Sequence, residues 1–295
     1  MEGEEKMLKA VLKAAGEYFE SNLSSSKRAM RYAIERGLDE DIRRTFGIGY
    51  APERRDYLFR HLKERGFLET DIIASGLMSK RYTMSSIFSD RIMIPIRNMD
   101  GEIVGFGGRK IDGDSPKYIN SPTTAIYSKS GILFGMDIAK ETQKAAYVIV
   151  EGYMDTMALH KAGITNAVGI LGTALTEEMA AIIKKHKRKA VLMLDSDEAG
   201  MKAAVRSRHV LKTADIPTYI CTLPEGYKDP DEYLKDHTGE EMRAIINASP
   251  TAEEYMASKI REDYAKTKDA ALLTERLIEE YGYDAGKIIS FVSTM

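Results

Sequence analysis

The chain has 295 residues, of which 43% are hydrophobic and 30% charged, a balance that excludes a disordered or collagen-like protein. Its formal net charge is only −2, yet Lys27–Lys129 has a surplus of 5 basic residues and Glu151–Met295 a surplus of 5 acidic ones. The single cysteine, Cys221, excludes an intramolecular disulfide and a multi-cysteine zinc site. With neither a signal peptide nor a membrane-length apolar run, we expect an intracellular, soluble protein with more than one folded unit.

The amino-terminal part is expected to be helical. Leu8, Leu12 and Phe19 belong to an apolar set that recurs every three or four residues, and Gly37 ends a second short helix. Short helices and turns are expected over 38–88.

A different pattern begins at Arg91. Residues 91–97 and 102–106 read as two strands joined by the turn Asn98-Met99-Asp100-Gly101, which predicts a hairpin. The stretch 112–130 is rich in Ser, Pro, Thr and Gly, so an ordered but irregular loop is expected there.

Strands and helices alternate from Ala145 onwards. Strands are expected at 146–150, 166–170, 190–194 and 217–223, and helices at 153–162, 176–185 and 198–214. This alternation predicts a parallel sheet flanked by helices, with ligand sites at the carboxyl ends of its strands. The tail after Glu240 is expected to be helical again.

Acidic residues follow three of these expected strands. They are Glu151, Asp155, Asp195, Asp197, Asp229 and Asp231. Because parallel strands end at one edge of the sheet, the carboxylates should converge there and repel one another unless a cation compensates them. Oxygen ligands of this kind suit Mg²⁺ or Mn²⁺ rather than zinc. The alternative is that each acid only caps the helix that follows it, where Asp and Glu are favoured.

The motifs resemble a known family. Glu151-Gly-Tyr-Met-Asp155 and Asp195-Ser-Asp197 look like the Toprim module shared by bacterial-type (DnaG) primases, topoisomerases, recombination proteins and some nucleases. Further segments are similar to the primase version: Arg91-Ile-Met-Ile-Pro-Ile-Arg97, Gly105-Phe-Gly-Gly-Arg109, Pro116-Lys-Tyr-Ile-Asn-Ser-Pro122, Tyr127-Ser-Lys129, Leu171-Gly-Thr173 and Lys228-Asp-Pro-Asp231. The resemblance therefore favours a primase catalytic core.

The resemblance implies a mixed α/β and α+β fold of several subdomains. A basic, mixed α+β amino-terminal subdomain is expected over 1–143, a Toprim domain with a Rossmann-like parallel sheet over 144–239, and a helical carboxyl-terminal subdomain over 240–295. With one cysteine and a short tail, we expect neither the family's zinc module nor its helicase-binding module in this chain.

The resemblance also implies roles for individual residues. The catalytic acids would be Glu151, Asp195 and Asp197, with Asp155, Asp229 and Asp231 as further metal ligands. Nucleic acid or nucleotide would be bound by Arg91, Arg109, Lys117, Tyr118, Asn120 and Lys129. Sequence leaves open whether Glu151 is a metal ligand or a general base.

The activity implied is metal-dependent nucleotidyl transfer that makes short RNA primers on single-stranded DNA, with two or more Mg²⁺ or Mn²⁺ ions and no zinc. The expected partners are single-stranded DNA template, ribonucleoside triphosphates and the RNA–DNA hybrid, with the replicative helicase reached only through the missing module. A cytoplasmic monomer without membrane contact is expected. A Toprim-type nuclease and a non-catalytic single-stranded DNA-binding module remain as alternatives.

Overall fold

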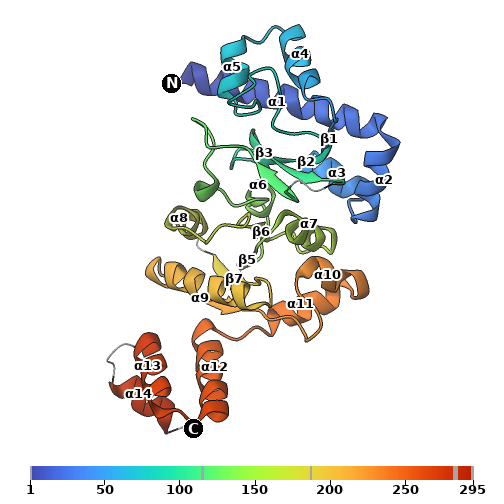
Figure 1. The fold of residues 1–295 in the computed structure, drawn as a ribbon. Coiled ribbons are helices and arrows are strands. Elements are labelled where there is room, and N and C mark those ends of the chain that lie inside the picture. Colours follow the sequence, from blue (N-terminus) through green and yellow to red (C-terminus); the bar gives the residue numbers. More distant parts are fainter. Residues whose placement is uncertain (1, 114–115, 187, 282–284, 294–295) are drawn as a thin grey trace.

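The computed structural model describes residues 2–113, 116–186, 188–281 and 285–293. Figure 1 shows three parts in succession: helices with an antiparallel sheet at the top, a second sheet with its helices in the middle, and a small helical unit at the bottom. The two sheets lie on either side of residue 144 in the sequence, and all strands of the first precede Ser121.

The amino-terminal part packs a long helix against an antiparallel sheet. Its helices are α1 (Glu2–Ser25), α2 (Lys27–Glu35), α3 (Glu40–Phe46), α4 (Asp56–Glu64) and α5 (Glu69–Ala74). Its strands, paired in chain order, are β1 (Gly49–Ala51), β2 (Arg91–Arg97), β3 (Ile103–Lys110) and β4 (Tyr118–Asn120). Phe19 of α1 meets Phe106 of β3 edge to face at 5.2 Å. Gly49 lets β1 approach α1 closely, because a Cβ there would lie 2.5 Å from the Phe19 backbone carbonyl carbon.

The structure confirms the predicted hairpin, formed by β2 and β3, and differs from the sequence in the loop that follows. Within the expected irregular stretch, Tyr118–Asn120 forms β4 and pairs with β3. Three residues carry too little alternation to signal a strand; the open edge of β3 supplies the pairing. The predicted second short helix is present as α2, which begins after Ser26, whose side chain accepts from the Ala29 N–H, and ends shortly before Gly37.

The middle part contains the predicted parallel sheet. Its strands are β5 (Ala146–Val150), β6 (Ala167–Gly169), β7 (Lys189–Leu192) and β8 (Thr218–Ile220), in the order β6-β5-β7-β8. The helices are α7 (Tyr153–Lys161), α8 (Glu177–Lys185), α9 (Glu198–Thr213) and α10 (Pro230–Asp236), while η1 (Lys129–Gly131) and α6 (Met136–Ala139) connect the two sheets. Val148, Ile149 and Val150 are fully buried, as expected for a strand covered on both faces.

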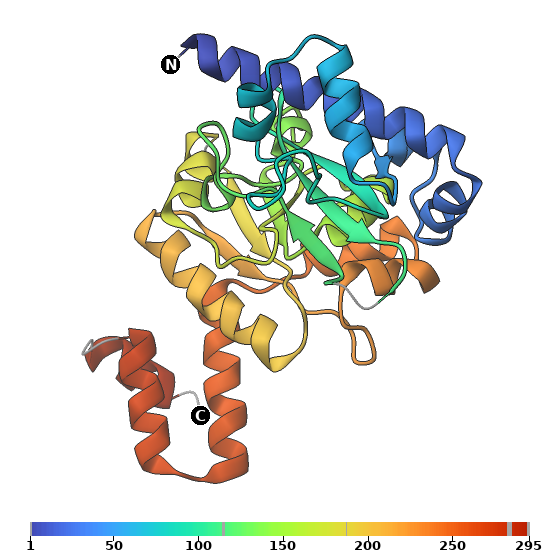
Figure 2. The ribbon, with the colours of Figure 1, turned by 45° about the horizontal axis from the view of Figure 1, so that its top comes forward.

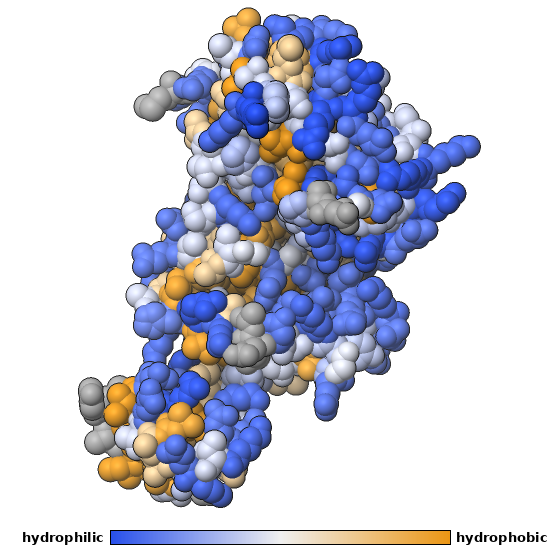
Figure 3. Space-filling model, viewed as in Figure 1, coloured by the Kyte–Doolittle hydropathy of each residue, from blue (hydrophilic) through white to orange (hydrophobic). Residues whose placement is uncertain are grey.

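The carboxyl-terminal helices are α11 (Gly239–Asn247), α12 (Ala252–Thr267), α13 (Ala270–Tyr281) and α14 (Ala285–Val292). Figure 2 shows the last three projecting away from the rest of the molecule. They share a small core of Ile260, Leu277 and Phe291, while Ile289 on α14 is 67% exposed. Apolar side chains are visible on this helical unit at the lower left of Figure 3. Nowhere in the described ranges does a helix combine the length and apolar character that a bilayer crossing requires.

Candidate active site

The strand order of the parallel sheet creates a crevice at the end of β5. Because β5 lies between β6 and β7, the connections after β5 and β6 run to opposite sides, which is where open α/β sheets bind ligands. Glu151 follows β5 directly, and Asp195 lies shortly after β7. The Asp195 backbone N–H donates to Glu151 Oε1 at 3.1 Å, so these two acidic positions meet as predicted from the sequence.

Several of the other acids also cap helices. The carboxylate of Asp155 accepts from the Gly152 N–H, that of Asp197 from the Gly200 N–H, and that of Asp229 from the Glu232 N–H, at 2.8–3.0 Å. The capping interpretation therefore describes these contacts correctly. Each cap uses one oxygen of a carboxylate that has about four acceptor positions, so these side chains can still bind another ligand.

The carboxylates raise one another's pKa. Burial, followed by repulsion from Asp229, Asp195 and Asp231, raises the pKa of Asp155 to about 7. Burial and the charge of Asp195 raise the pKa of Glu151. The acids are therefore close enough to destabilise one another's charged forms, as the sequence predicted for this edge.

The donor chemistry of this edge suits a hard divalent cation. Asp231 is also affected, since burial raises its pKa and the charge of Asp229 adds to the rise. Within the described residues, however, no three His, Cys, Asp or Glu side chains are already grouped tightly enough to hold an ion. Carboxylate oxygens that repel one another are the ligands that Mg²⁺ and Mn²⁺ stabilise, so the residue types fit these ions even though the side chains are not grouped as a finished site.

Lys228 supplies positive charge inside this acidic group. Its Nζ lies 3.3 Å from Asp195 Oδ2 and 3.2 Å from Asp197 Oδ2. The sequence predicted the two aspartates that follow Lys228 as ligands, but gave this lysine no role. Only the folded loop places its ammonium between the two acidic side chains.

The opposite wall of the crevice comes from β3, β4 and the segment after them. A cleft of about 610 Å³ is lined on this side by Arg109, Lys117, Tyr118, Asn120 and Lys129, and on the other by Glu151, Asp155, Asp195, Asp229 and Asp231. The structure thus brings most of the predicted basic, aromatic and acidic residues to one cavity. Asp197 is not part of the lining, but reaches it through its ion pair with Lys228.

Partly buried hydrogen bonds hold this basic wall in place. Arg109 donates through Nε to Tyr32 Oη at 3.0 Å and through Nη1 to Tyr118 Oη. Tyr153, on α7 of the acidic wall, donates to Asn120 Oδ1 at 2.6 Å. A Cβ on Gly107 would lie 2.4 Å from the Tyr153 ring, so a glycine is required where the two walls meet.

Arg91, predicted to bind nucleic acid or nucleotide, is not among the residues that line the cleft. Its residue is only 4% exposed, and Nη1 donates to the backbone carbonyls of Gly108 and Pro116 at 3.0 and 2.9 Å. A buried guanidinium bound to carbonyls is a structural support for the hairpin and does not face the cleft. Its position on β2 turns the side chain inwards, which a basic residue at the start of a strand does not reveal by itself.

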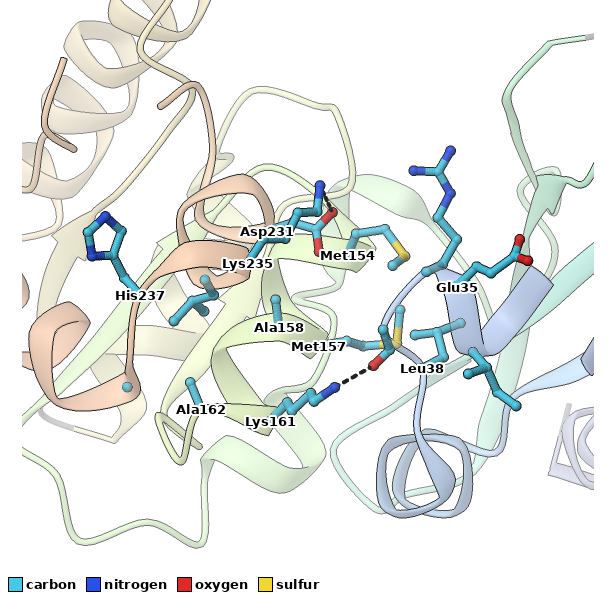
Figure 4. A pocket seen from close by; sticks show the side chains of 15 residues that line it. Glu35, Leu38, Met154, Met157, Ala158, Lys161, Ala162, Asp231, Lys235 and His237 are labelled. Atoms are coloured by element: carbon cyan, nitrogen blue, oxygen red, sulfur yellow. Dashed lines mark hydrogen bonds and ion pairs between the residues drawn. The ribbon is translucent and has the colours of Figure 1, made fainter. Parts of the chain in front are cut away.

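Arg36 is a cleft residue that sequence reasoning missed. It follows the end of α2, lines the cleft, and its positive charge opposes the rise in the pKa of Asp231. An adjoining cavity of about 520 Å³ shares Arg36, Met154, Asp231 and Lys235 with the cleft. Figure 4 shows Asp231 and Lys235 of α10 facing the wall that carries Glu35 and Leu38. The local sequence signals only a helix end at Gly37, so no pattern in it would have found Arg36.

Two family models match the chain. The model for the amino-terminal domain of the DNA primase catalytic core matches residues 18–140, and a Toprim-like model matches residues 148–234. The DNA primase of Clostridium acetobutylicum is 38% identical over 237 residues, which cover 79% of this chain and 40% of that protein. The chain thus spans about half or less of the length of the curated relatives it matches.

Solved primase structures have the same fold. The zinc-binding and RNA polymerase domains of the Aquifex aeolicus primase superpose with a TM-score of 0.84 at 34% identity, covering 98% of this chain and 72% of that one. A DnaG primase catalytic domain bound to single-stranded DNA superposes with a TM-score of 0.81 at 25% identity, covering 98% and 97%. The similarity extends over both sheets and both walls of the cleft.

Proposed function

Since the chain belongs to the DnaG family of bacterial DNA primases, we propose that it is a primase catalytic core that makes short RNA primers on single-stranded DNA. The observation that carries this proposal is the pairing of two unlike walls in one cleft. Carboxylates at the ends of β5 and β7 face Lys117, Tyr118 and Asn120 of the antiparallel sheet. Template-directed synthesis needs both walls. A basic wall holds the polyanionic strand and the triphosphate, and metal ions bound by the acidic wall would stabilise the negative charge that develops during the reaction.

Glu151, Asp195 and Asp197 are the residues that would hold Mg²⁺ or Mn²⁺, with Asp155, Asp229 and Asp231 as further ligands. Divalent ions bound there would stabilise negative charge on the attacking and leaving oxygens of nucleotidyl transfer. Glu151 is either one of these ligands or the general base; its raised pKa makes the carboxylate a stronger proton acceptor than an ordinary glutamate.

The basic wall would position the strands. Arg109, Lys117 and Lys129 would bind template or triphosphate oxygens, and the Tyr118 ring offers a face for stacking a base. Burial lowers the pKa of Lys129, because the cleft removes water from the ammonium, and an anionic ligand bound there would stabilise the charged form. Asn120 accepts a hydrogen bond from Tyr153, which leaves its amide N–H groups to donate to a base or a sugar.

The partners proposed for this core are single-stranded DNA, ribonucleoside triphosphates and the RNA–DNA hybrid product. A structural neighbour was solved with single-stranded DNA, which supports the first of these. We place the protein in the bacterial cytoplasm, as a monomer, with the helicase engaged through a family module outside this core.

The test is incubation of the purified chain with a single-stranded DNA template, labelled ribonucleotides and Mg²⁺ or Mn²⁺. Labelled RNA of a few to some tens of nucleotides is the expected product, and the Asp195→Asn variant, prepared in parallel, should make none. Shortened template without RNA would instead identify a nuclease, and retarded but unchanged template a binding module. Either of those results would overturn the proposed function.

A further inference from the structure

We propose that Lys228 competes with the divalent cation for Asp195 and Asp197, and that the ammonium faces the nucleotide phosphates once the ion has displaced it. The inference rests on the proposed function for the identity of the ion and the nucleotide. It adds a residue to the site whose effect on metal binding and on nucleotide binding should have opposite signs.

The backbone around Lys228 is bound firmly to the acidic loop. The Lys228 carbonyl accepts from both the backbone N–H and the Oγ of Ser196, each at 3.0 Å. Ser196 lies between Asp195 and Asp197 in the sequence, and its Oγ also donates to the Tyr227 carbonyl at 2.7 Å. These bonds hold the start of the lysine side chain beside the two carboxylates whatever else binds in the cleft.

The Lys228 side chain, in contrast, extends into solvent. It is 55% exposed, and within the part of the chain that the structure describes it forms ion pairs with Asp195 Oδ2 and Asp197 Oδ2. A lysine ammonium is charged at neutral pH. An ammonium at Asp195 Oδ2 and Asp197 Oδ2 and a divalent ion bound between the same carboxylates repel each other, so each weakens the binding of the other. We therefore expect the ion to displace the ammonium.

The cleft sets the direction in which the ammonium can go. Lys228 is part of the lining that also includes Arg109, Lys117 and Lys129 on the facing wall. A lysine on a flexible four-carbon stem is suited to follow a phosphate as a mobile point charge. Displacement thus adds a cation to the space between the walls at the time when the metal and the triphosphate arrive.

Lys235 provides a matched control within the same region. It lies on α10, also lines the cleft, and pairs with Asp231 at 4.0 Å, the outer edge of ion-pair distance. Its side chain is as exposed as that of Lys228, but it contacts neither Asp195 nor Asp197 through the ion pairs that the described residues form. Removing Lys235 therefore changes the net charge of the cleft equally without removing the ammonium that pairs with Asp195 and Asp197; its own partner is Asp231, one of the further ligands, at the outer edge of ion-pair distance.

The experiment is a Mn²⁺ titration of the purified chain, followed by electron paramagnetic resonance of the free ion, for the unmodified protein, Lys228→Met and Lys235→Met. We expect Lys228→Met to bind Mn²⁺ about threefold to tenfold more tightly and Lys235→Met to change affinity by less than about twofold. Lys228→Arg keeps a cation in place and should retain most of the competition. Circular dichroism of each variant confirms that it is folded, and Lys228→Gln is a second neutral variant for the same measurement.

Nucleotide affinity at saturating Mn²⁺ is the second readout, measured by fluorescence of a labelled ribonucleoside triphosphate. Lys228→Met should weaken it about threefold, opposite in sign to its effect on the metal. Equal or weaker Mn²⁺ binding by Lys228→Met and Lys228→Gln would overturn the competition, and unchanged nucleotide affinity would overturn the second role. Because neither measurement involves primer synthesis, tighter Mn²⁺ binding in a chain that makes no RNA would support the role of Lys228 and refute the proposed function separately.

Discussion

The two walls of the cleft hold their charges in different ways. The acidic wall consists of strand-end loops, where sheet topology brings Glu151 and Asp195 together. Burial raises the pKa of both carboxyl groups, and a neighbouring carboxylate adds to each rise, Asp195 for Glu151 and Asp229 for Asp195. The basic wall consists of paired strands, where Arg109 is buried and hydrogen bonded to Tyr32 and Tyr118. Charge on the first wall therefore opposes folding, whereas charge on the second is part of the packing. Substitutions on the acidic wall should therefore impair function without lowering stability. On the basic wall, removing a buried charged residue should lower stability as well.

The largest effect is expected on the acidic wall. Asp195→Asn and Glu151→Gln should each reduce RNA synthesis at least about a thousandfold, equivalent to about 4 kcal/mol of activation free energy, because they remove oxygens that would hold the metal. Without metal, thermal stability should hold or rise, since one repelling charge is gone. Synthesis assays and melting curves in EDTA measure both. Near-normal synthesis by either folded variant would contradict the assignment.

Asp155 makes the acidic wall sensitive to pH. Its residue is 8% exposed and its pKa in the folded protein is about 7, against 3.8 for the ordinary group. Because the folded-state pKa is raised, the protonated carboxyl contributes stability that is fully present below about pH 4 and is lost as the pH rises through 7, up to about 4 kcal/mol.

Urea unfolding in EDTA at pH 5 and pH 8 checks this prediction. The unmodified protein should lose about 2–3 kcal/mol of unfolding free energy between the two values beyond any loss in Asp155→Asn, whose amide oxygen can still accept from the Gly152 N–H. Adding Mg²⁺ at pH 8 should recover part of the loss. Equal pH dependence in both proteins would remove Asp155 as the source.

On the basic wall we expect a smaller loss of function, accompanied at one residue by a loss of stability. Arg109→Ala and Lys117→Ala should each weaken single-stranded DNA binding by about threefold to tenfold, and the log–log salt slope should decrease by about 0.7 for each lost phosphate contact. Only Arg109→Ala should also cost stability, about 2 kcal/mol, because Tyr32 and Tyr118 lose a buried partner. Binding titrations across salt concentrations, with unfolding curves for both variants, test the difference. Unchanged binding by both would return these residues to a structural and a surface role.

The smallest effect is expected where the walls meet. Tyr153→Phe removes the hydrogen bond to Asn120 and should reduce the unfolding free energy by about 1 kcal/mol. A double-mutant cycle with Asn120→Ala isolates this contact. A coupling energy near zero would mean that this hydrogen bond does not help to hold the two walls together.

The sequence by itself determined the elements and the positions of the acids. The apolar run at 146–150 and the alternation of strands and helices after it specified the parallel sheet, because the apolar residues of a segment reflect the burial of that segment. Residues directly after a strand, such as Glu151, inherit the strand's position at the sheet edge, so their convergence could be predicted without coordinates. The hairpin of β2 and β3 was equally accessible, since its turn residues adjoin the strands that they join.

Only the tertiary structure decided which side chains meet across the cleft. The β2–β3 register leaves Arg91 buried against the carbonyls of Gly108 and Pro116, and pairing with β3 turns Tyr118–Asn120 into a strand. Arg36 reaches the acids from a segment with no local signal of function, and Lys228 from a motif in which a role was predicted for the aspartates alone. Contacts of this kind depend on strand order and on the approach of distant loops. No local pattern contains that information, because it belongs to pairs of segments and not to either segment alone.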